Sequence, residues 1–220
     1  PDELANTAFA ARKAREDDRY RADANNRVPR RIDSHLEVFD CISCDKCLPV
    51  CPNAANFVYT SPDVDLVYTD YVVGDGGSFQ GGEERRFRLE KKHQIANYAA
   101  FCNECGNCDT FCPEYGGPYI EKPSFYLDEE SFNAEAPRDG FFVRGPRSID
   151  GRVKGKLYRL EQAGETEFRL KSEDAIAILS HDARLLRVQE ASAGARIDAG
   201  LFLMMRVLLE GVTDTSRANQ

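Results

Sequence analysis

The chain has 220 residues, a hydrophobic fraction of 42% and a net charge of -8 at pH 7. This length and apolar content suffice for one substantial domain or two small ones with a buried core. The negative charge argues against a sequence-independent binder of nucleic acid or anionic membranes, which needs a basic surface. The most apolar window, residues 199–212, is interrupted by Arg206 and Glu210 and is too short to cross a bilayer.

The N-terminal region, residues 1–36, is predicted to be a helical extension and linker. Residues 1–24 have the spacing of a helix with one apolar face. We interpret the arginine cluster at 27–31 as a solvated linker, with docking on an acidic partner as the alternative. The sequence lacks a signal-peptide pattern, so we expect a cytoplasmic protein. Because it begins at Pro1 in a helical-looking segment, we also expect it to be part of a longer polypeptide or a hetero-complex.

Two cysteine-rich motifs follow, "CISCDKCLPVCP" at 41–52 and "CNECGNCDTFCP" at 102–113, and they contain all eight cysteines of the chain. The sequence between them alternates enough to predict strands at 56–60, 64–73 and 85–98. The glycine-rich run at 74–82 is predicted to be the tip of a hairpin. It lacks the lysine and serine that follow the glycines of a phosphate-binding loop.

The region after the second motif is predicted to mix strands and helices. Residues 114–126 are rich in turn-forming and aromatic residues and are expected to wrap the second of two metal sites. Short strands are predicted at 140–145, 155–161 and 166–172, and Ser172 is predicted to cap a helix over 173–180.

A last helix is predicted over 199–210, with Asp198 as its N-terminal cap and Gly211 at its end. It is apolar on nearly all faces. We therefore expect it to be buried in a small α+β tail domain or pressed against another subunit.

The cysteine spacing identifies the chemistry. Cysteines this close together cannot easily form disulfides without strained closures, and a cytoplasmic chain would keep them reduced. Zinc is the stronger alternative, because pairs of C-x2-C build tetrahedral sites. However, both motifs read C-x2-C-x2-C-x3-C-P, which is the arrangement of bacterial two-cluster ferredoxins. The spacing therefore predicts two 4Fe-4S clusters.

In this arrangement the fourth cysteine of each motif binds the cluster of the other motif. The predicted ligands of cluster 1 are Cys41, Cys44, Cys47 and Cys112, and those of cluster 2 are Cys102, Cys105, Cys108 and Cys51. Pro52 and Pro113 are expected in the first turn of a short helix that directs the fourth ligand. An apolar shell around the clusters is expected from Ile42, Leu48, Val50, Phe101 and Phe111, for which plain core packing is the alternative.

No independent catalytic site is recognisable in the sequence. His35, His93 and His181 are scattered, without a serine or carboxylate constellation beside them in sequence. We expect them to be surface or strand residues. Neither a Ser-His-Asp, an HExxH nor a Walker pattern is present.

The motifs and their flanks resemble a known family. "CDKCLPVCPNAANFVY" and "QIANYAAFCNECGNCDTFCPEYGGPYIEKPSFY", followed by "RDGFFV", are similar to the C-terminal two-cluster ferredoxin region of large iron-sulfur flavoproteins. These include the glutamate synthase small subunit, dihydropyrimidine dehydrogenase and proteins of the selenate reductase subunit type. The resemblance covers residues 37–145. In that family FAD accepts a hydride from NAD(P)H and passes single electrons to iron-sulfur clusters, so the resemblance implies FAD and NAD(P)H on a partner domain or subunit.

Taken together, the sequence predicts an α+β fold. It comprises the extension 1–36, a two-cluster ferredoxin-like domain with a β-rich insertion over 37–135, and a small α+β tail domain over 136–220. Two functions remain open. One is an electron-transfer module that relays single electrons between a flavin and another redox site of a larger oxidoreductase. The other is a partner-binding or sensory module in which iron-sulfur clusters or zinc ions are structural.

Overall fold

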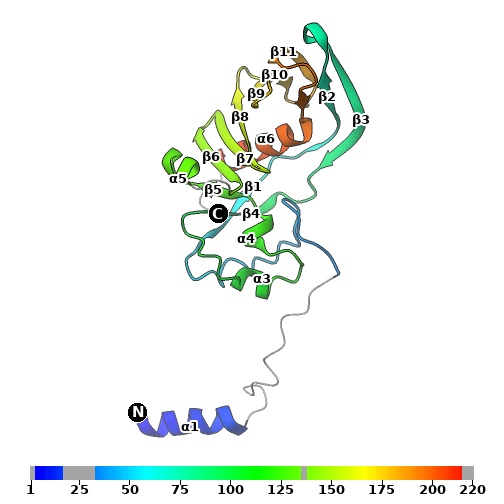
Figure 1. Cartoon of the computed structure of the whole chain (residues 1–220). Helices are drawn as coiled ribbons and strands as arrows, with labels where there is room; N and C mark the ends of the chain where they lie inside the picture. Colours follow the sequence, from blue (N-terminus) through cyan, green and yellow to red (C-terminus); the bar gives the residue numbers. More distant parts are fainter. Residues whose placement is uncertain (1–2, 17–32, 135–137, 215–220) are drawn as a thin grey trace.

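The computed structural model describes residues 3–16, 33–134 and 138–214. Most strands belong to one nine-stranded sheet, shown in the upper part of Figure 1. Its strands, in spatial order, are β1 (Asn56–Thr60), β4 (His93–Tyr98), β5 (Ser124–Tyr126), β6 (Gly140–Gly145), β7 (Ser148–Val153), β8 (Lys156–Gln162), β9 (Glu167–Lys171), β10 (Ala175–Ser180) and β11 (Leu185–Ala191). A second sheet has the order β12 (Arg196–Ile197), β2 (Asp65–Val73) and β3 (Phe79–Arg88).

Short helices connect the strands. They are η2 (Asp75–Gly77), α3 (Asn107–Phe111), α4 (Pro118–Glu121) and α5 (Glu129–Ala134), while α1 (Glu3–Glu16) lies near the N-terminus. Strand β5 pairs in parallel with both β4 and β6, and the other neighbours are antiparallel. Parallel neighbours need a crossover connection. The second cysteine motif lies in the crossover from β4 to β5.

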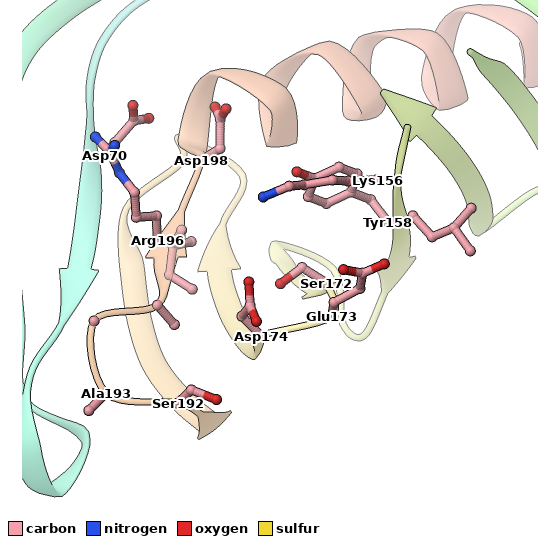
Figure 2. A pocket seen from close by; sticks show the side chains of 14 residues that line it. Asp70, Lys156, Tyr158, Ser172, Glu173, Asp174, Ser192, Ala193, Arg196 and Asp198 are labelled. Atoms are coloured by element: carbon pink, nitrogen blue, oxygen red, sulfur yellow. The ribbon is translucent and has the colours of Figure 1, made fainter. Parts of the chain in front are cut away.

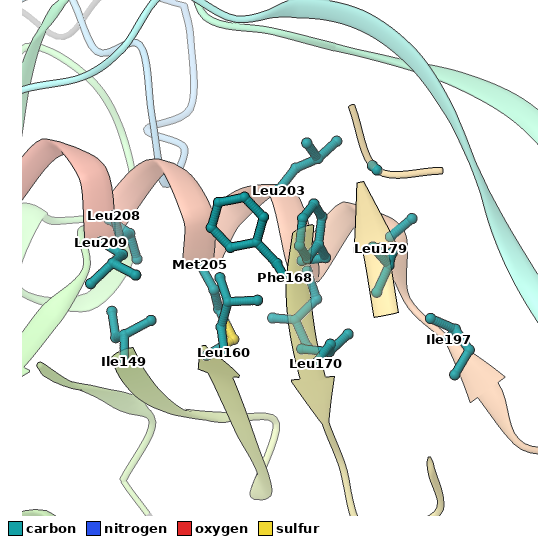
Figure 3. Close-up of a cluster of buried hydrophobic side chains, with 14 of the residues drawn as sticks. Ile149, Leu160, Phe168, Leu170, Leu179, Ile197, Leu203, Met205, Leu208 and Leu209 are labelled. Atoms are coloured by element: carbon teal, nitrogen blue, oxygen red, sulfur yellow. The ribbon is translucent and has the colours of Figure 1, made fainter. Parts of the chain in front are cut away.

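Helix α6 (Ala199–Thr213) forms the centre of the main core, and it contacts β1, β2, β7 and β8. Figure 3 shows its leucines and Met205 packed on side chains of the sheet such as Ile149 and Leu160. Of the two predicted environments for this helix, burial within the chain is therefore confirmed. Even Arg206 is only 1% exposed, and it bonds to His181 Nε2 at 2.6 Å and to Glu210 at 3.0 Å.

The ends of α6 agree with the sequence in part. Asp198 caps the helix as predicted, since its carboxylate accepts a hydrogen bond from the Leu201 N–H at 2.8 Å. Gly211 does not end the helix, which continues to Thr213. Instead Gly211 allows a close approach to β1, because a Cβ there would lie 2.8 Å from the ring of Tyr59.

The main sheet runs across residue 136, where the sequence predicts a boundary between two domains. Phe125 of β5 pairs with Phe141 of β6, and α6 contacts strands on the other side of that boundary. The predicted ferredoxin-like and tail regions thus share one sheet and one core in a mixed α and β structure with few helices. The division at residues 36 and 136 stays a prediction about folding units.

Several predicted elements are confirmed. Strands β1, β2, β6, β8 and β9 lie where the sequence places them, and α1 confirms a helix over 3–16. The remainder of the predicted N-terminal helix and the arginine cluster 27–31 lie outside the described residues. The sequence does not predict strands β5, β7, β11 and β12.

The predicted helix over 173–180 is wrong, because Ala175–Ser180 form strand β10. Its apolar run is short, and a buried strand and a buried helix segment cannot be distinguished by periodicity at that length. Two of its buried residues, Ile176 and Ile178, are β-branched and favour a strand. Ser172 accepts a hydrogen bond from the Ala175 N–H at 3.1 Å in the turn before the strand, so it caps no helix.

Two further boundaries differ from the prediction. The segment 85–98 is divided between β3 and β4, and the expected hairpin tip at 74–82 is shorter because β3 begins at Phe79. Gly81 and Gly82 lie within β3, opposite an irregularity in the pairing between Thr69 and Tyr71. Glycine inside a strand often marks such a bulge. In the described parts of the chain, no helix is long and apolar enough to span a membrane.

Candidate iron-sulfur centre

Both cysteine motifs lie at the same end of the β1–β4 strand pair. These strands are antiparallel, with Asn56 opposite Asn97. The first motif ends just before β1 begins, and the second begins just after β4 ends. The sheet therefore brings together two segments that are separated by about 50 residues of chain.

The two loops repeat one backbone conformation. Ser43 and Glu104, each two residues after the first cysteine of its motif, have φ angles of 53° and 56°. Asp45 and Gly106, each one residue after the second cysteine, have φ angles of 55° and 77°. Left-handed residues are uncommon outside glycine and cluster at functional sites. Successive turns of this kind direct N–H groups into a concavity that suits an anion, and iron-sulfur sites use such concavities.

Four cysteines, three from the first motif and one from the second, line one hollow. They are Cys41, Cys44, Cys47 and Cys112, and we call them the first cysteine set. The other lining residues are Leu36, Ile42, Asp45, Ile95, Glu114, Pro118 and Lys122. The mostly apolar lining and the thiols on several sides fit a 4Fe-4S cluster, which needs thiolate ligands at separate corners and shelter from water.

The remaining cysteines, Cys102, Cys105, Cys108 and Cys51, are called the second cysteine set. Hydrogen bonds attach the segment around Cys51 to the second motif on both sides. The Asn53 amide donates to the Phe101 carbonyl at 2.9 Å, and the Asn107 amide donates to the Val50 carbonyl at 3.3 Å. The last cysteine of the first motif is therefore held beside the second motif.

The two sets are neighbours. Cys47 of the first set and Cys108 of the second set are both buried and belong to one apolar cluster with Ile95. Leu48, Val50 and Tyr119 pack against the same cluster. Apolar side chains thus connect a cysteine of one set with a cysteine of the other.

Burial has a strong effect on the thiols. It is the largest cause that raises the pKa of Cys47 to about 12, and the nearby thiols of Cys41, Cys108, Cys44 and Cys112 add to it. A thiol with this pKa keeps its proton near neutral pH. Metal binding to the site must therefore release protons, which is general for thiolate ligands.

The pKa values of Cys51 and Cys108 shift in opposite directions. Burial raises the pKa of Cys108, although the Tyr119 N–H and the Asn56 amide oppose this effect. At Cys51 burial also acts to raise the pKa, but N–H groups of the following turn outweigh it and lower the pKa. The Ala55 N–H donates to Cys51 Sγ at 3.2 Å. Such N–H groups stabilise a thiolate and would also stabilise a metal-bound sulfur.

The predicted apolar shell is correct in part. Leu48 and Val50 pack near the cysteines, and Ile42 lines the first hollow although it is 38% exposed. Phe101 and Phe111 are 46% and 43% exposed, and for them the expected place in the shell stays a prediction. The missed members include Ile95 and Leu36, which come from segments outside the motifs.

The prolines after the motifs do not begin helices, which corrects the prediction for Pro52 and Pro113. Pro52 lies in a turn in which the Ala54 N–H bonds the Cys51 carbonyl at 3.2 Å. Helix α3 ends immediately before Cys112, which is its C-terminal cap residue. The fourth cysteine of the second motif thus follows the end of a helix and does not begin one.

Charged side chains at the first set were not predicted. Lys122 is 3% exposed, and its ammonium donates to the backbone carbonyls of Glu37 at 2.7 Å and Val38 at 3.3 Å. Burial lowers the pKa of Lys122, while anionic neighbours that include Cys41 and Glu114 act to raise it. Glu114 is 6% exposed and accepts a hydrogen bond from the Ile42 N–H at 3.3 Å. Both belong to the segment 114–126, which the sequence places around the second metal site, whereas these two residues line the first hollow.

A site for a single metal ion would need several ligating side chains close together. Among residues 3–16, 33–134 and 138–214, no three His, Cys, Asp or Glu side chains converge closely enough to hold a single metal ion. Two of the three histidines have side-chain partners. His93 Nε2 lies 2.6 Å from Asp45 Oδ1, and His181 bonds to Arg206.

A hollow of about 600 Å³ lies away from the cysteines, between β8, β12 and the loop before β10. Figure 2 shows its mixed lining of Lys156, Arg196 and several carboxylates. Two of these carboxylates have structural roles, since Asp198 caps α6 and Asp70 accepts a hydrogen bond from the Ala199 N–H at 3.0 Å. The arrangement does not indicate a particular ligand.

Comparisons with known proteins agree with the cysteine geometry. Residues 37–115 match the family described as 4Fe-4S dicluster domain. A 4Fe-4S dicluster domain is therefore present in this chain. No solved structure matches the chain.

Two similar curated proteins are both named "Putative oxidoreductase YgfK". The protein from Escherichia coli O157:H7 is 32% identical over 142 residues, which are 63% of this chain and 11% of that protein. The protein from Escherichia coli strain K12 is 35% identical over 115 residues, which are 52% of this chain and 8% of that protein. The chain thus spans only about a tenth of the length of these relatives. Together with the dicluster domain, this similarity supports a role in electron transfer.

Proposed function

We propose that this chain is an electron-transfer module of a larger oxidoreductase. It would relay single electrons through two 4Fe-4S clusters, from a flavin that NAD(P)H reduces to a further redox site. The observation that carries this proposal is the first hollow, where three cysteines of one motif and Cys112 of the other face a common space. This grouping supports the crossed arrangement that two-cluster ferredoxins use.

In the proposed assignment, cluster 1 is held by the first cysteine set and cluster 2 by the second. Support for the second set comes from the bonds that hold the Cys51 turn at the second motif. The N–H groups around Cys51 stabilise its thiolate form. Buried Cys47 and Cys108, with Ile95 between the motifs, keep water from the space between the sets.

When bound, a 4Fe-4S cluster supplies reversible one-electron chemistry at a potential that its surroundings set. The chain contributes thiolate ligands, an apolar environment and backbone N–H groups. Because the two sets share one apolar cluster, an electron passes between them without crossing a layer of solvent. These properties favour a relay over a purely structural role.

The flavin and the nicotinamide nucleotide are proposed to bind a partner domain or subunit. This part of the proposal is supported by the resemblance of the motif flanks to iron-sulfur flavoproteins. It is also supported by the size of the YgfK relatives, which are oxidoreductases by name and extend far beyond the matched segment. Proteins of that length have room for domains that bind a flavin and a nicotinamide nucleotide.

A reconstitution experiment tests the proposal. Purified anaerobically, the chain alone should hold iron and sulfide and should not oxidise NAD(P)H. With a flavin-bearing domain of its complex added, NAD(P)H should bleach the visible absorbance of the iron-sulfur clusters. Oxidation of NAD(P)H by the chain alone would contradict the placement of the flavin. Two bound zinc ions without visible absorbance would favour a structural module instead.

A further inference from the structure

The first cysteine set has a buried cation at its hollow. Lys122 follows α4 and is 3% exposed, and it lines the same hollow as Cys41, Cys44, Cys47 and Cys112. No other lysine in the described part of the chain is buried. Burying a lysine is costly unless its charge is compensated, so its position needs an explanation.

The hydrogen bonds of Lys122 explain only its placement. Its Nζ donates to the carbonyls of Glu37 and Val38, which are neutral acceptors. They hold the side chain against the segment that enters the first motif but supply no opposite charge. Glu114 lines the same hollow and supplies a negative charge near Lys122, and its carboxylate also accepts hydrogen bonds from the Ile42 N–H and the Ser34 hydroxyl.

A 4Fe-4S cluster with four thiolates is anionic, and reduction adds one more negative charge. A fixed positive charge in a region of low dielectric constant stabilises the more negative state. The reduction potential of such clusters depends on the net charge and burial around them. A buried ammonium at the first set therefore favours the reduced state there.

We propose that Lys122 selectively raises the reduction potential at the first cysteine set. Lys122 is thus a positioning residue that acts through the cluster, and it binds no iron. The inference rests on the proposed function, because it requires a redox-active cluster at that set. The inference goes beyond the proposed function, because it names a residue that makes the electrostatic surroundings of the two sets unequal.

The chain offers variants that separate charge from hydrogen bonding. Lys122→Met removes both, Lys122→Gln keeps a donor without the charge, and Lys122→Arg keeps the charge. Lys46 provides a matched control, since it lies between Cys44 and Cys47 but is exposed to solvent. Water screens an exposed charge, so Lys46→Met should have little effect.

The experiment is an anaerobic redox titration of the full chain followed by EPR. Signals are assigned with Cys44→Ser, which perturbs the first set, and Cys105→Ser, which perturbs the second. Lys122→Met and Lys122→Gln should lower the midpoint potential of the first set and leave that of the second nearly unchanged. Lys122→Arg and Lys46→Met should stay close to the wild type. The shift should persist at high salt, because buried charges are weakly screened.

Other results would overturn the inference. One is an unchanged midpoint potential of the first set in Lys122→Gln, and another is an equal shift of the midpoint potential at both sets. A third is a shift of the midpoint potential in Lys122→Met alone, which would indicate the effect of a lost hydrogen bond. If Lys122→Met does not fold, the Gln and Arg variants still decide the question. A wild-type chain without redox-active clusters would instead refute the proposed function, and the two failures are therefore distinguishable.

Discussion

The side-chain amide of Asn53 donates a hydrogen bond to the backbone carbonyl of Phe101 at 2.9 Å. Asn53 lies in the turn after Cys51, and Phe101 directly precedes Cys102. The bond thus joins the end of the first motif to the beginning of the second. Since the Asn107 amide also bonds the Val50 carbonyl, Cys51 is bracketed by contacts with the motif whose cluster it is proposed to bind.

Substitution of Cys51 tests this crossed ligation. Cys51→Ser should damage the cluster of the second set and leave that of the first set largely intact, because Cys112 and not Cys51 lines the first hollow. EPR of the reduced variant, with iron and sulfide measured on the same sample, shows which signal is lost. Cys112→Ser is the matched control and should give the opposite pattern. Selective loss of the first-set signal in Cys51→Ser would refute the crossing.

The hydrogen bond of Asn53 should itself support the second set. Asn53→Ala removes a bond of about 1 kcal/mol in typical cases. The second set should then lose iron to a chelator several-fold faster than in the wild type, while the first set is unaffected. Asn103→Ala, a change at an exposed asparagine of the second motif, serves as the control. Equal rates of iron loss in the Asn53→Ala variant and the wild type would show that this contact is unimportant.

Sequence alone predicts the parts of the structure that depend on local patterns. The cysteine spacing predicts the dicluster domain, and Asp198 before an apolar run predicts the start of α6. Strand β10 was missed because a six-residue apolar run carries no reliable periodicity. Tertiary packing determines that this segment is a strand and not a helix.

The surroundings of the cysteines were harder to predict than the ligands. Ile95 comes from β4 and Lys122 from the segment between α4 and β5, and both line the first hollow. Strands β4 and β5 pair in parallel. The parallel register of these two strands has no local signal in the sequence. The candidate ligands can therefore be predicted from the cysteine spacing. The residues around them, which would adjust their chemistry, are placed by the tertiary fold and cannot be predicted in this way.

The close packing of α6 on β1 gives a stability prediction. In Gly211→Ala, the added Cβ would lie 2.8 Å from the Tyr59 ring and 3.0 Å from the Thr60 carbonyl oxygen. Overpacking of this kind typically costs about 1–3 kcal/mol. Urea unfolding should show the loss at an unchanged m-value. Gly145→Ala, where a Cβ has open space, should be close to neutral. Equal stability of the two variants would contradict the packing described here.

The buried Arg206 predicts unequal effects of two substitutions. Glu210→Ala leaves the guanidinium with only a histidine partner in the core, whereas Arg206→Met replaces the cation by an apolar side chain. Leaving a buried charge uncompensated costs about 3–5 kcal/mol in fully buried pairs, and apolar replacement is often nearly neutral. Because Glu210 is 30% exposed, we expect a smaller cost than that for Glu210→Ala. Denaturant unfolding that finds Arg206→Met the more damaging change would contradict this expectation.

The most direct test of the central claim is a redox titration of the anaerobically purified full chain, followed by EPR, with its metals quantified on the same sample. The account predicts about eight irons and about eight acid-labile sulfides per chain, as two 4Fe-4S clusters require. It also predicts that both sets accept and release one electron reversibly when a strong reductant is added and removed. Two zinc ions without visible absorbance, or clusters that stay redox-silent while the parent complex turns over, would contradict the relay.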